Sequence, residues 1–152
     1  MTGKTHVAGG LLVGIIATQI MDVHIGYALI SGLGALLPDI DEPHSTIGRK
    51  IPGSFLFKFL FGHRGFFHSL LAAGLFYLAL FLVADHAVAQ LMAAGYISHL
   101  LLDALTPSGV PFLYPIKKRY SLDLIKTGGI REYAFLFAMV VILLAIGGRS
   151  PL

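Results

Sequence analysis

Two side chains that can bind a metal ion stand four residues apart near the end of a long apolar run. In the segment 98–106, three leucines separate His99 from Asp103. On a helix, residues four apart lie one above the other, so the imidazole and the carboxylate would point the same way. A carboxylate at the centre of a membrane helix costs roughly 2.5–3.5 kcal/mol unless something, such as a divalent cation, compensates it. The pair predicts a metal site. The alternative is that the two side chains form hydrogen bonds that hold neighbouring helices together.

Two further pairs of potential ligands lie between residues 39 and 68. Asp39 and Asp41 follow Pro38. Because proline disfavours helix before it, the carboxylates are predicted to lie in extended backbone with both side chains on one side. The alternative is a helix-terminating turn. His63 and His68 are five apart, about 140° out of register on an unbroken helix, so at least one must lie in a loop. Their alternative is a position at the membrane interface.

The composition indicates an integral membrane protein. Of its 152 residues, 56% are hydrophobic and 12% are charged, whereas soluble domains carry about 25% charged residues. The chain has no cysteine, so any metal must be held by histidine and carboxylate. The formal net charge of +3 suits an anionic membrane surface. No nucleic-acid partner is expected, because no DNA-binding motif accompanies that charge.

Five apolar stretches can position these side chains. They cover residues 7–21, 25–37, 66–84, 87–105 and 133–146. We therefore predict an all-α integral membrane bundle of about five helices, forming one domain over residues 1–152. The third and fourth stretches approach the roughly 20 residues that a spanning helix needs. The other three are short and must span a thinned bilayer or lie partly within the bundle. Four glycines predict close approach of the first two helices, namely Gly10, Gly14, Gly32 and Gly34.

The basic residues predict the orientation. If the amino terminus is cytoplasmic, the loops after the second and fourth stretches are basic and the opposite face keeps only Arg149. The basic loop residues are Arg49, Lys50, Lys58, Arg64, Lys117, Lys118, Arg119, Lys126 and Arg131. This predicts a multi-pass protein of a bacterial or archaeal inner membrane. The starts of the first, third and fifth helices would then share the cytoplasmic side with the ends of the second and fourth.

The candidate ligands all fall on that predicted cytoplasmic side. They are His6, Asp39, Asp41, His63, His68, His99, Asp103 and Glu132. Solubilising groups would appear at both ends, yet the far end offers only Asp22, His24, Asp85 and His86, which we predict to lie in solvated turns. We therefore predict a divalent metal site, with zinc favoured and manganese or iron as alternatives. Eight candidates leave both one ion and two ions open. Glu132 has an alternative as an acidic residue in the first turn of a helix.

Such a site predicts phosphoester hydrolysis. A divalent ion lowers the pKa of bound water toward 7 and holds the oxygens of a phosphoester. Catalytic roles are predicted for Asp39, Asp41, Arg49 and Arg64, because arginine can grip phosphate oxygens in bidentate fashion. A substrate arriving from the bilayer would be a lipid phosphoester or pyrophosphate. The alternatives are a transporter or proton relay, haem ligation between helices, and a non-enzymatic scaffold. The oligomeric state stays open.

Taken together, the motifs resemble a known family, the YdjM-type inner-membrane-associated metal-dependent hydrolases, also described as LexA-binding. The resemblance covers nearly the whole chain. It rests on Thr5-His6, Pro38-Asp39-Ile40-Asp41 with Ser45, His63-Arg64-Gly65-Phe66-Phe67-His68-Ser69, Ser98-His99 and Asp103 with Thr106-Pro107 and Gly109, and Gly128-Gly129 with Glu132.

That family is distantly similar to the zinc-dependent phospholipases C, which are all-helical and hold their metal cluster with histidines, aspartates and a glutamate. The similarity implies phosphoester hydrolysis. This chain contains no tryptophan, whereas those phospholipases use an amino-terminal tryptophan as a ligand. The LexA description implies a link to the DNA-damage response, and nothing in these residues supports DNA binding.

Overall fold

The computed structural model describes residues 1–43, 45, 47–50 and 65–147. These residues form five α-helices, which confirms the all-helical prediction: α1 Gly3–Ile20, α2 Ala28–Gly34, α4 Leu70–Val83, α5 His86–Ala104 and α6 Ile130–Gly147. Short 3-10 helices join them: η1 Ile25–Tyr27, η2 Leu37–Asp41, η3 Gly48–Lys50 and η4 Phe66–His68. A single antiparallel bridge in the described chain pairs Val110 with Tyr120.

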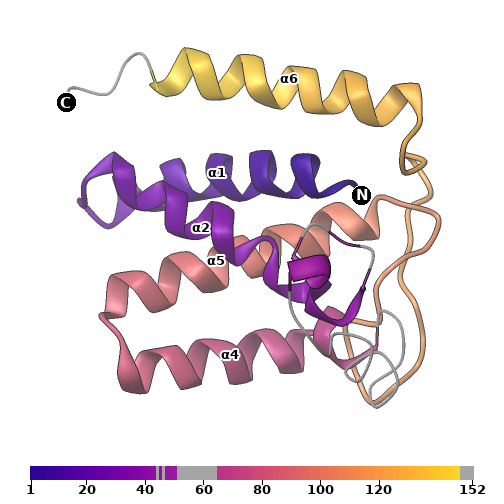
Figure 1. Cartoon of the computed structure of the whole chain (residues 1–152), viewed down its shortest axis with the longest axis horizontal. Coiled ribbons are helices and arrows are strands. Elements are labelled where there is room, and N and C mark those ends of the chain that lie inside the picture. Colours follow the sequence, from indigo (N-terminus) through magenta and orange to yellow (C-terminus); the bar gives the residue numbers. More distant parts are fainter. Residues whose placement is uncertain (44, 46, 51–64, 148–152) are drawn as a thin grey trace.

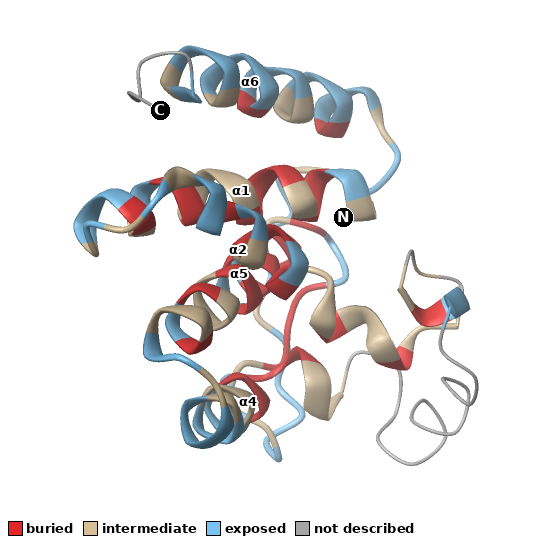
Figure 2. Ribbon diagram, turned by 60° about the vertical axis from the view of Figure 1, so that its left-hand side comes forward, coloured by how far each residue is buried: buried red, intermediate tan, exposed pale blue. Residues whose placement is uncertain are grey.

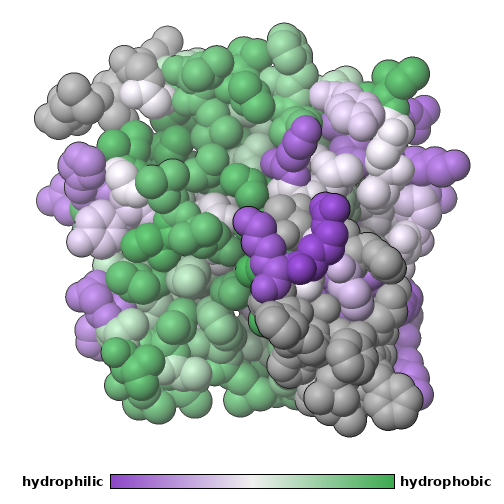
Figure 3. All heavy atoms as spheres, viewed as in Figure 1, coloured by the Kyte–Doolittle hydropathy of each residue, from purple (hydrophilic) through white to green (hydrophobic). Residues whose placement is uncertain are grey.

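The helices run side by side along one direction (Figure 1). Helices α1, α2 and α5 pack against one another, while α4 lies on α5 and α6 lies on α1. The starts of α1, α4 and α6 and the ends of α2 and α5 share one end of the bundle, as the basic residues predicted (Figure 1). We call this the polar end, comprising these termini, η2 and η4. A broad hydrophobic band covers the face seen in Figure 3 beside this end.

Close packing of the central helices depends on glycine. A Cβ added at Gly10 would lie 2.8 Å from the Ser31 carbonyl oxygen, and one at Gly14 would lie 2.8 Å from the Ala28 carbonyl oxygen. This contact confirms the predicted close approach of α1 and α2. On the other side of α2, a Cβ at Gly95 would lie only 1.9 Å from the Ser31 oxygen. Helix α2 is therefore held backbone to backbone between α1 and α5.

Two helices in the described chain are long and apolar enough to cross a membrane, α5 and α6. The prediction that 66–84 forms a helix of nearly spanning length is wrong. Helix α4 has only 14 residues, because Phe66–His68 forms a separate 3-10 turn. The helix then begins after Ser69, whose Oγ accepts a hydrogen bond from the Ala72 amide. Helix α6, predicted to be short, has 18 residues and can span.

The stretch 25–37 does not form one helix. It is divided into η1, α2 and the start of η2. At 1.5 Å per residue, the 7 residues of α2 extend about 10 Å, roughly a third of the hydrocarbon core. Buried residues line α2, as the red segments of Figure 2 show. Of the two possibilities for this stretch, a place within the bundle is the one observed.

The predicted extended backbone at Asp39 and Asp41 is also wrong. Both residues belong to η2, in which Pro38 occupies the first turn. Proline suits the first turn of a helix because its missing N–H would have no partner there. In a helix with three residues per turn, side chains two apart point in different directions. The two carboxylates therefore approach the site differently.

Candidate metal centre

Helix α5 supplies two donors in its last turns. His99 and Asp103 are fully buried, and His99 Nε2 lies 3.7 Å from Asp103 Oδ2. The other ring nitrogen, Nδ1, donates to the Ala35 carbonyl oxygen at 2.7 Å, just past the end of α2. A hydrogen bond of this kind fixes the tautomer and the orientation of a metal-binding histidine. His99 therefore presents Nε2 to the centre of the site.

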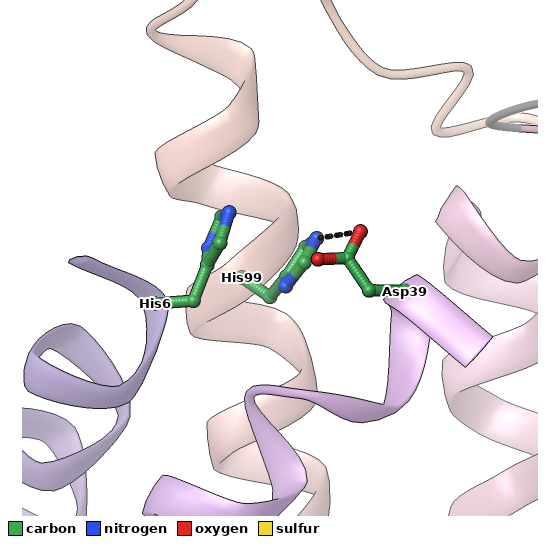
Figure 4. Close-up of side chains that lie close together, drawn as sticks. All are labelled: His6, Asp39 and His99. Carbon is green, nitrogen blue, oxygen red and sulfur yellow. Dashed lines mark ion pairs between the residues drawn. The ribbon is translucent and has the colours of Figure 1, made fainter. Parts of the chain in front are cut away.

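Two more donors come from η2 and η4. His68 Nε2 lies 3.3 Å from His99 Nε2 and 3.7 Å from Asp103 Oδ2. Asp39 Oδ1 lies 3.6 Å from His68 Nε2 and 3.8 Å from His99 Nε2. Figure 4 shows the Asp39 carboxylate facing the His99 ring. Side chains from positions 39 to 103 thus converge on the Nε2 atoms of His68 and His99, and we call these residues the four-donor set: Asp39, His68, His99 and Asp103.

These separations suit a single metal ion. Donors placed about 2.0–2.1 Å from zinc in a tetrahedron lie roughly 3.3 Å from one another. Two overlapping groups can each hold an ion with ligand atoms within 4.8 Å: His6, Asp39 and His99, and His68, His99 and Asp103. Both contain His99, whose Nδ1 already bonds to Ala35. One remaining nitrogen lone pair can bind only one ion, so the two groups cannot hold separate ions that both use His99.

His6 packs directly on this set from the first turn of α1 (Figure 4). Its ring stacks on the His99 ring with a centroid separation of 3.6 Å and an interplanar angle of 12°. Its Nε2 lies 3.3 Å from Asp103 Oδ1, an oxygen that also contacts the Met1 amino group. His6 is fully buried, yet among the residues that the structure describes neither ring nitrogen has a hydrogen-bond partner. Since buried polar atoms are nearly always paired, this pattern points to a polar partner such as an ion.

Asp41 stands behind His68. Its Oδ1 lies 4.0 Å from His68 Nδ1, the nitrogen that faces away from the four-donor set. Asp41 is fully buried, and within the described part of the chain neither of its oxygens has a hydrogen-bond partner. A carboxylate in this place can orient the histidine and raise its basicity. The structure therefore places Asp41 beside the predicted ligand His68.

The two aspartates of η2 differ in acidity. Burial has the largest effect on Asp41 and raises the pKa of its carboxyl to about 6, with Asp39 adding to the increase and His68 opposing it. Burial also raises the pKa of Asp39, but His68, His99 and His6 outweigh it and hold that pKa at about 2. At neutral pH, Asp39 is therefore fully ionised, as a metal ligand must be.

Glu132 lies outside both groups of potential ligands. Its Oε1 accepts hydrogen bonds from the Thr2 amide at 2.6 Å and the Thr5 hydroxyl at 2.7 Å, and its Oε2 accepts one from the Gly128 amide at 2.6 Å. These bonds join the start of α6 to the start of α1. Glu132 thus holds the start of α1, the helix that carries His6, beside the start of α6. This position agrees better with an acidic residue in the first turn of a helix than with a metal ligand.

Of the two predicted phosphate-binding arginines the structure describes one, Arg49, which lies outside the four-donor set. Arg49 is exposed on η3, and its Nε donates to the Ser45 carbonyl oxygen at 3.2 Å. Ser45 Oγ in turn donates to the Asp39 carbonyl oxygen at 2.8 Å, so this turn supports η2. Arg64, together with the predicted ligand His63, lies outside the described residues.

Some supporting contacts were not predicted. The Ala35 carbonyl that orients His99 could not be predicted from the sequence, because every residue has a backbone carbonyl. The Tyr96 hydroxyl donates to the Phe67 carbonyl oxygen and so holds the residue before His68. A signal for Tyr96 did exist, since it lies three residues before His99 and so near the same helix face. The predicted turn residues His24 and His86 are exposed at the far end.

Comparison with known proteins supports the resemblance. A family model described as YdjM inner membrane protein matches residues 1–150. The protein YvsG of Bacillus subtilis (strain 168) is 37% identical over 145 residues, covering 93% of this chain and 91% of YvsG. The inner membrane protein YdjM of Escherichia coli (strain K12) is 45% identical over 102 residues, covering 61% of this chain and 51% of that protein. No solved structure is significantly similar. The chain therefore belongs to the family of YdjM inner membrane proteins.

Proposed function

We propose that this protein is a membrane-bound, metal-dependent hydrolase that cleaves a phosphoester of a lipid or lipid-linked substrate. One observation carries the proposal. Three elements that are distant in sequence, η2, η4 and α5, bring the Nε2 atoms of His68 and His99 to 3.3 Å from each other and to 3.6–3.8 Å from a carboxylate oxygen of Asp39 and of Asp103. Burying so many ionisable groups together is costly unless they are paired or bind a metal.

In this proposal the four-donor set holds one divalent ion, with zinc favoured by the mixed histidine and carboxylate donors and manganese or iron as alternatives. Such an ion, when bound, polarises a phosphoryl oxygen and makes water nucleophilic at neutral pH. The chain's own contribution is to fix the donors. Ala35 orients His99, Asp41 places a carboxylate 4.0 Å from His68 Nδ1, and His6 covers one side of the site.

The overall reaction is a hydrolysis. A water oxygen forms a bond to phosphorus, the ester P–O bond breaks, and the departing alcohol takes a proton. Arg49 lies on the turn next to η2, and Arg64 is four residues before His68. We propose both as cations that hold the phosphate oxygens, because guanidinium groups bind phosphate in bidentate fashion.

We also propose that the site faces the cytoplasm in a multi-pass arrangement. Basic residues follow the polar end along the chain, on η3 after η2 and in the 105–129 loop after α5; they include Arg49, Lys50, Lys117, Lys118 and Arg119. An excess of lysine and arginine marks the cytoplasmic side of membrane proteins. A lipid headgroup at the inner leaflet would then lie at the depth of the four-donor set.

The geometry favours this proposal over the other classes. A proton relay needs ionisable groups along its whole path, yet every buried ionisable side chain in the described chain lies at the polar end. A haem needs room for its ring between two axial histidines. His6 and His99 are stacked at 3.6 Å, and the Nε2 atoms of His68 and His99 are 3.3 Å apart, so no porphyrin fits between either pair.

The experiment is a phosphatase assay on purified, metal-loaded protein with a panel of lipid phosphoesters. Asp39→Asn, His68→Ala and Asp103→Asn are each expected to abolish hydrolysis while membrane insertion is kept. Arg64→Lys should lose less activity than Arg64→Ala, because lysine keeps the charge and loses only the planar fork. Absence of any hydrolysis by wild-type protein that contains its metal would overturn the proposal.

A further inference from the structure

An apolar cavity lies on the side of the four-donor set where α4 packs on α5. Its volume is about 290 Å³. Its walls include Ile40 of η2, Phe67 of η4, Leu75, Phe76 and Ala79 of α4, and Tyr96 of α5. The Tyr96 hydroxyl, a polar group in this wall, already donates to the Phe67 carbonyl oxygen. The walls therefore offer an occupant apolar contact but few hydrogen bonds.

The cavity shares its walls with the elements that carry the metal donors. Ile40 stands between Asp39 and Asp41, and Phe67 directly precedes His68. Tyr96 lies one helical turn before His99 on α5. The same three elements thus present donor atoms on one side and apolar side chains on another. A molecule that reaches both surfaces must have a polar head and an apolar tail.

The α4 wall connects the cavity to the lipid-facing surface. Leu75 lines the cavity and is still 50% exposed, and neighbouring residues on α4 are open as well, with Leu71 46% and Leu78 52% exposed. Figure 2 shows an exposed side of α4 turned away from the bundle. In a membrane, that side contacts acyl chains. An alkyl chain can therefore enter beside α4 without passing through water.

We propose that this cavity binds one alkyl chain of an amphiphilic phosphoester whose headgroup lies at the four-donor set. The inference rests on the proposed function and adds to it the place where an alkyl chain of the substrate binds. A peptide is a poor occupant, because its backbone N–H and C=O groups would be buried without partners. A volume of 290 Å³ is at the lower limit of ligand pockets, about 300–1,000 Å³, and so admits one chain rather than a larger hydrophobic group.

The proposal predicts that affinity increases with the length of the alkyl chain only up to a limit. Each methylene that enters an apolar site improves binding about fourfold. Once the alkyl chain fills the cavity, further methylenes remain in the bilayer and do not increase the affinity. Simple partition into lipid or detergent continues to strengthen with every added methylene. The plateau therefore separates binding in the cavity from partition.

Because the chain has no tryptophan, a single introduced tryptophan reports on its own surroundings. Phe76→Trp places this reporter in the cavity wall. Phe137→Trp places it on α6 at a position that is 71% exposed, and so serves as the matched control for bulk lipid. The probe is a series of ω-bromoalkyl phosphonates, which quench tryptophan and have no phosphoester bond to hydrolyse. We expect saturable quenching with a chain-length plateau for Phe76→Trp, and weak, non-saturating quenching for Phe137→Trp.

A blocking variant tests the same point through activity. Ala79→Phe places a larger side chain in the cavity wall, and it should abolish saturable quenching of the Phe76→Trp reporter and lower kcat/KM at least tenfold for a long alkyl phosphate. Hydrolysis of water-soluble p-nitrophenyl phosphate should be unchanged.

Equal, non-saturating quenching at both reporters would overturn the proposal that the cavity binds an alkyl chain. The proposed function would remain intact, provided that p-nitrophenyl phosphate is still cleaved. Saturable quenching in protein that hydrolyses no phosphoester would instead overturn the proposal that the bound alkyl chain belongs to a substrate.

Discussion

Gly95→Ala tests whether the contact between α2 and α5 positions the metal site. The added Cβ would lie 1.9 Å from the Ser31 carbonyl oxygen and 2.9 Å from the Ala35 nitrogen. Since real Cβ contacts below 3.0 Å essentially do not occur, α2 must move away by at least about 1 Å. The bond from His99 Nδ1 to the Ala35 oxygen, now 2.7 Å, would then exceed hydrogen-bonding distance.

The expected effect has two parts. Overpacking costs about 1–3 kcal/mol and the lost hydrogen bond about 1 kcal/mol, so the free energy of unfolding should fall by roughly 2–4 kcal/mol. Loss of the bond that orients His99 should weaken metal binding about 10–100-fold.

Gly74→Ala is the matched control, because its Cβ would meet nothing within 4 Å. The assays are thermal unfolding and chelator competition on the detergent-purified protein. Equal metal affinity and stability in the two variants would refute the reasoning.

Two other predictions concern residues around the four-donor set. In the metal-free protein, the raised pKa of Asp41 means that its protonated carboxyl group stabilises the fold; this stabilisation is complete below pH 3.8 and is lost as pH rises through about 6. Asp41→Asn should therefore stabilise the apo form by roughly 2–3 kcal/mol at pH 7.5 but not at pH 4. The same substitution should weaken metal binding. Thermal melts at both pH values check this, and an equal change at both would contradict it. Glu132→Ala leaves three donors without their acceptor, so it should lower the melting temperature but keep the metal content, whereas metal loss at unchanged stability would make Glu132 a ligand.

The location of the site could be predicted from the sequence because membrane topology limits where chain segments can meet. Alternating helices place the start of one beside the end of the next, so the order of the apolar stretches was enough to assign His6 and Asp103 to one end of the bundle. The spacing of His99 and Asp103 then gave their common face. The first inference depends on the alternating direction of the helices, and the second on the 3.6-residue repeat of the α-helix.

The individual roles could not be predicted, because they depend on side-chain direction in short irregular segments. Pro38 was compatible with extended backbone or with the first turn of a 3-10 helix, and only the second places Asp41 behind His68. Glu132 had suitable chemistry for a ligand, but three hydrogen bonds hold it elsewhere. The seven-residue length of α2 was hidden because its neighbours are equally apolar.

The most direct test of the central claim is the metal content of protein purified without chelators, measured by inductively coupled plasma mass spectrometry. The four-donor set predicts one equivalent of a divalent metal per chain in wild type. His68→Ala and Asp39→Asn should retain less than a tenth of it. His86→Ala, which removes an exposed histidine at the far end, should retain all of it. Wild-type protein without stoichiometric metal, or His68→Ala with an undiminished amount, would contradict the account.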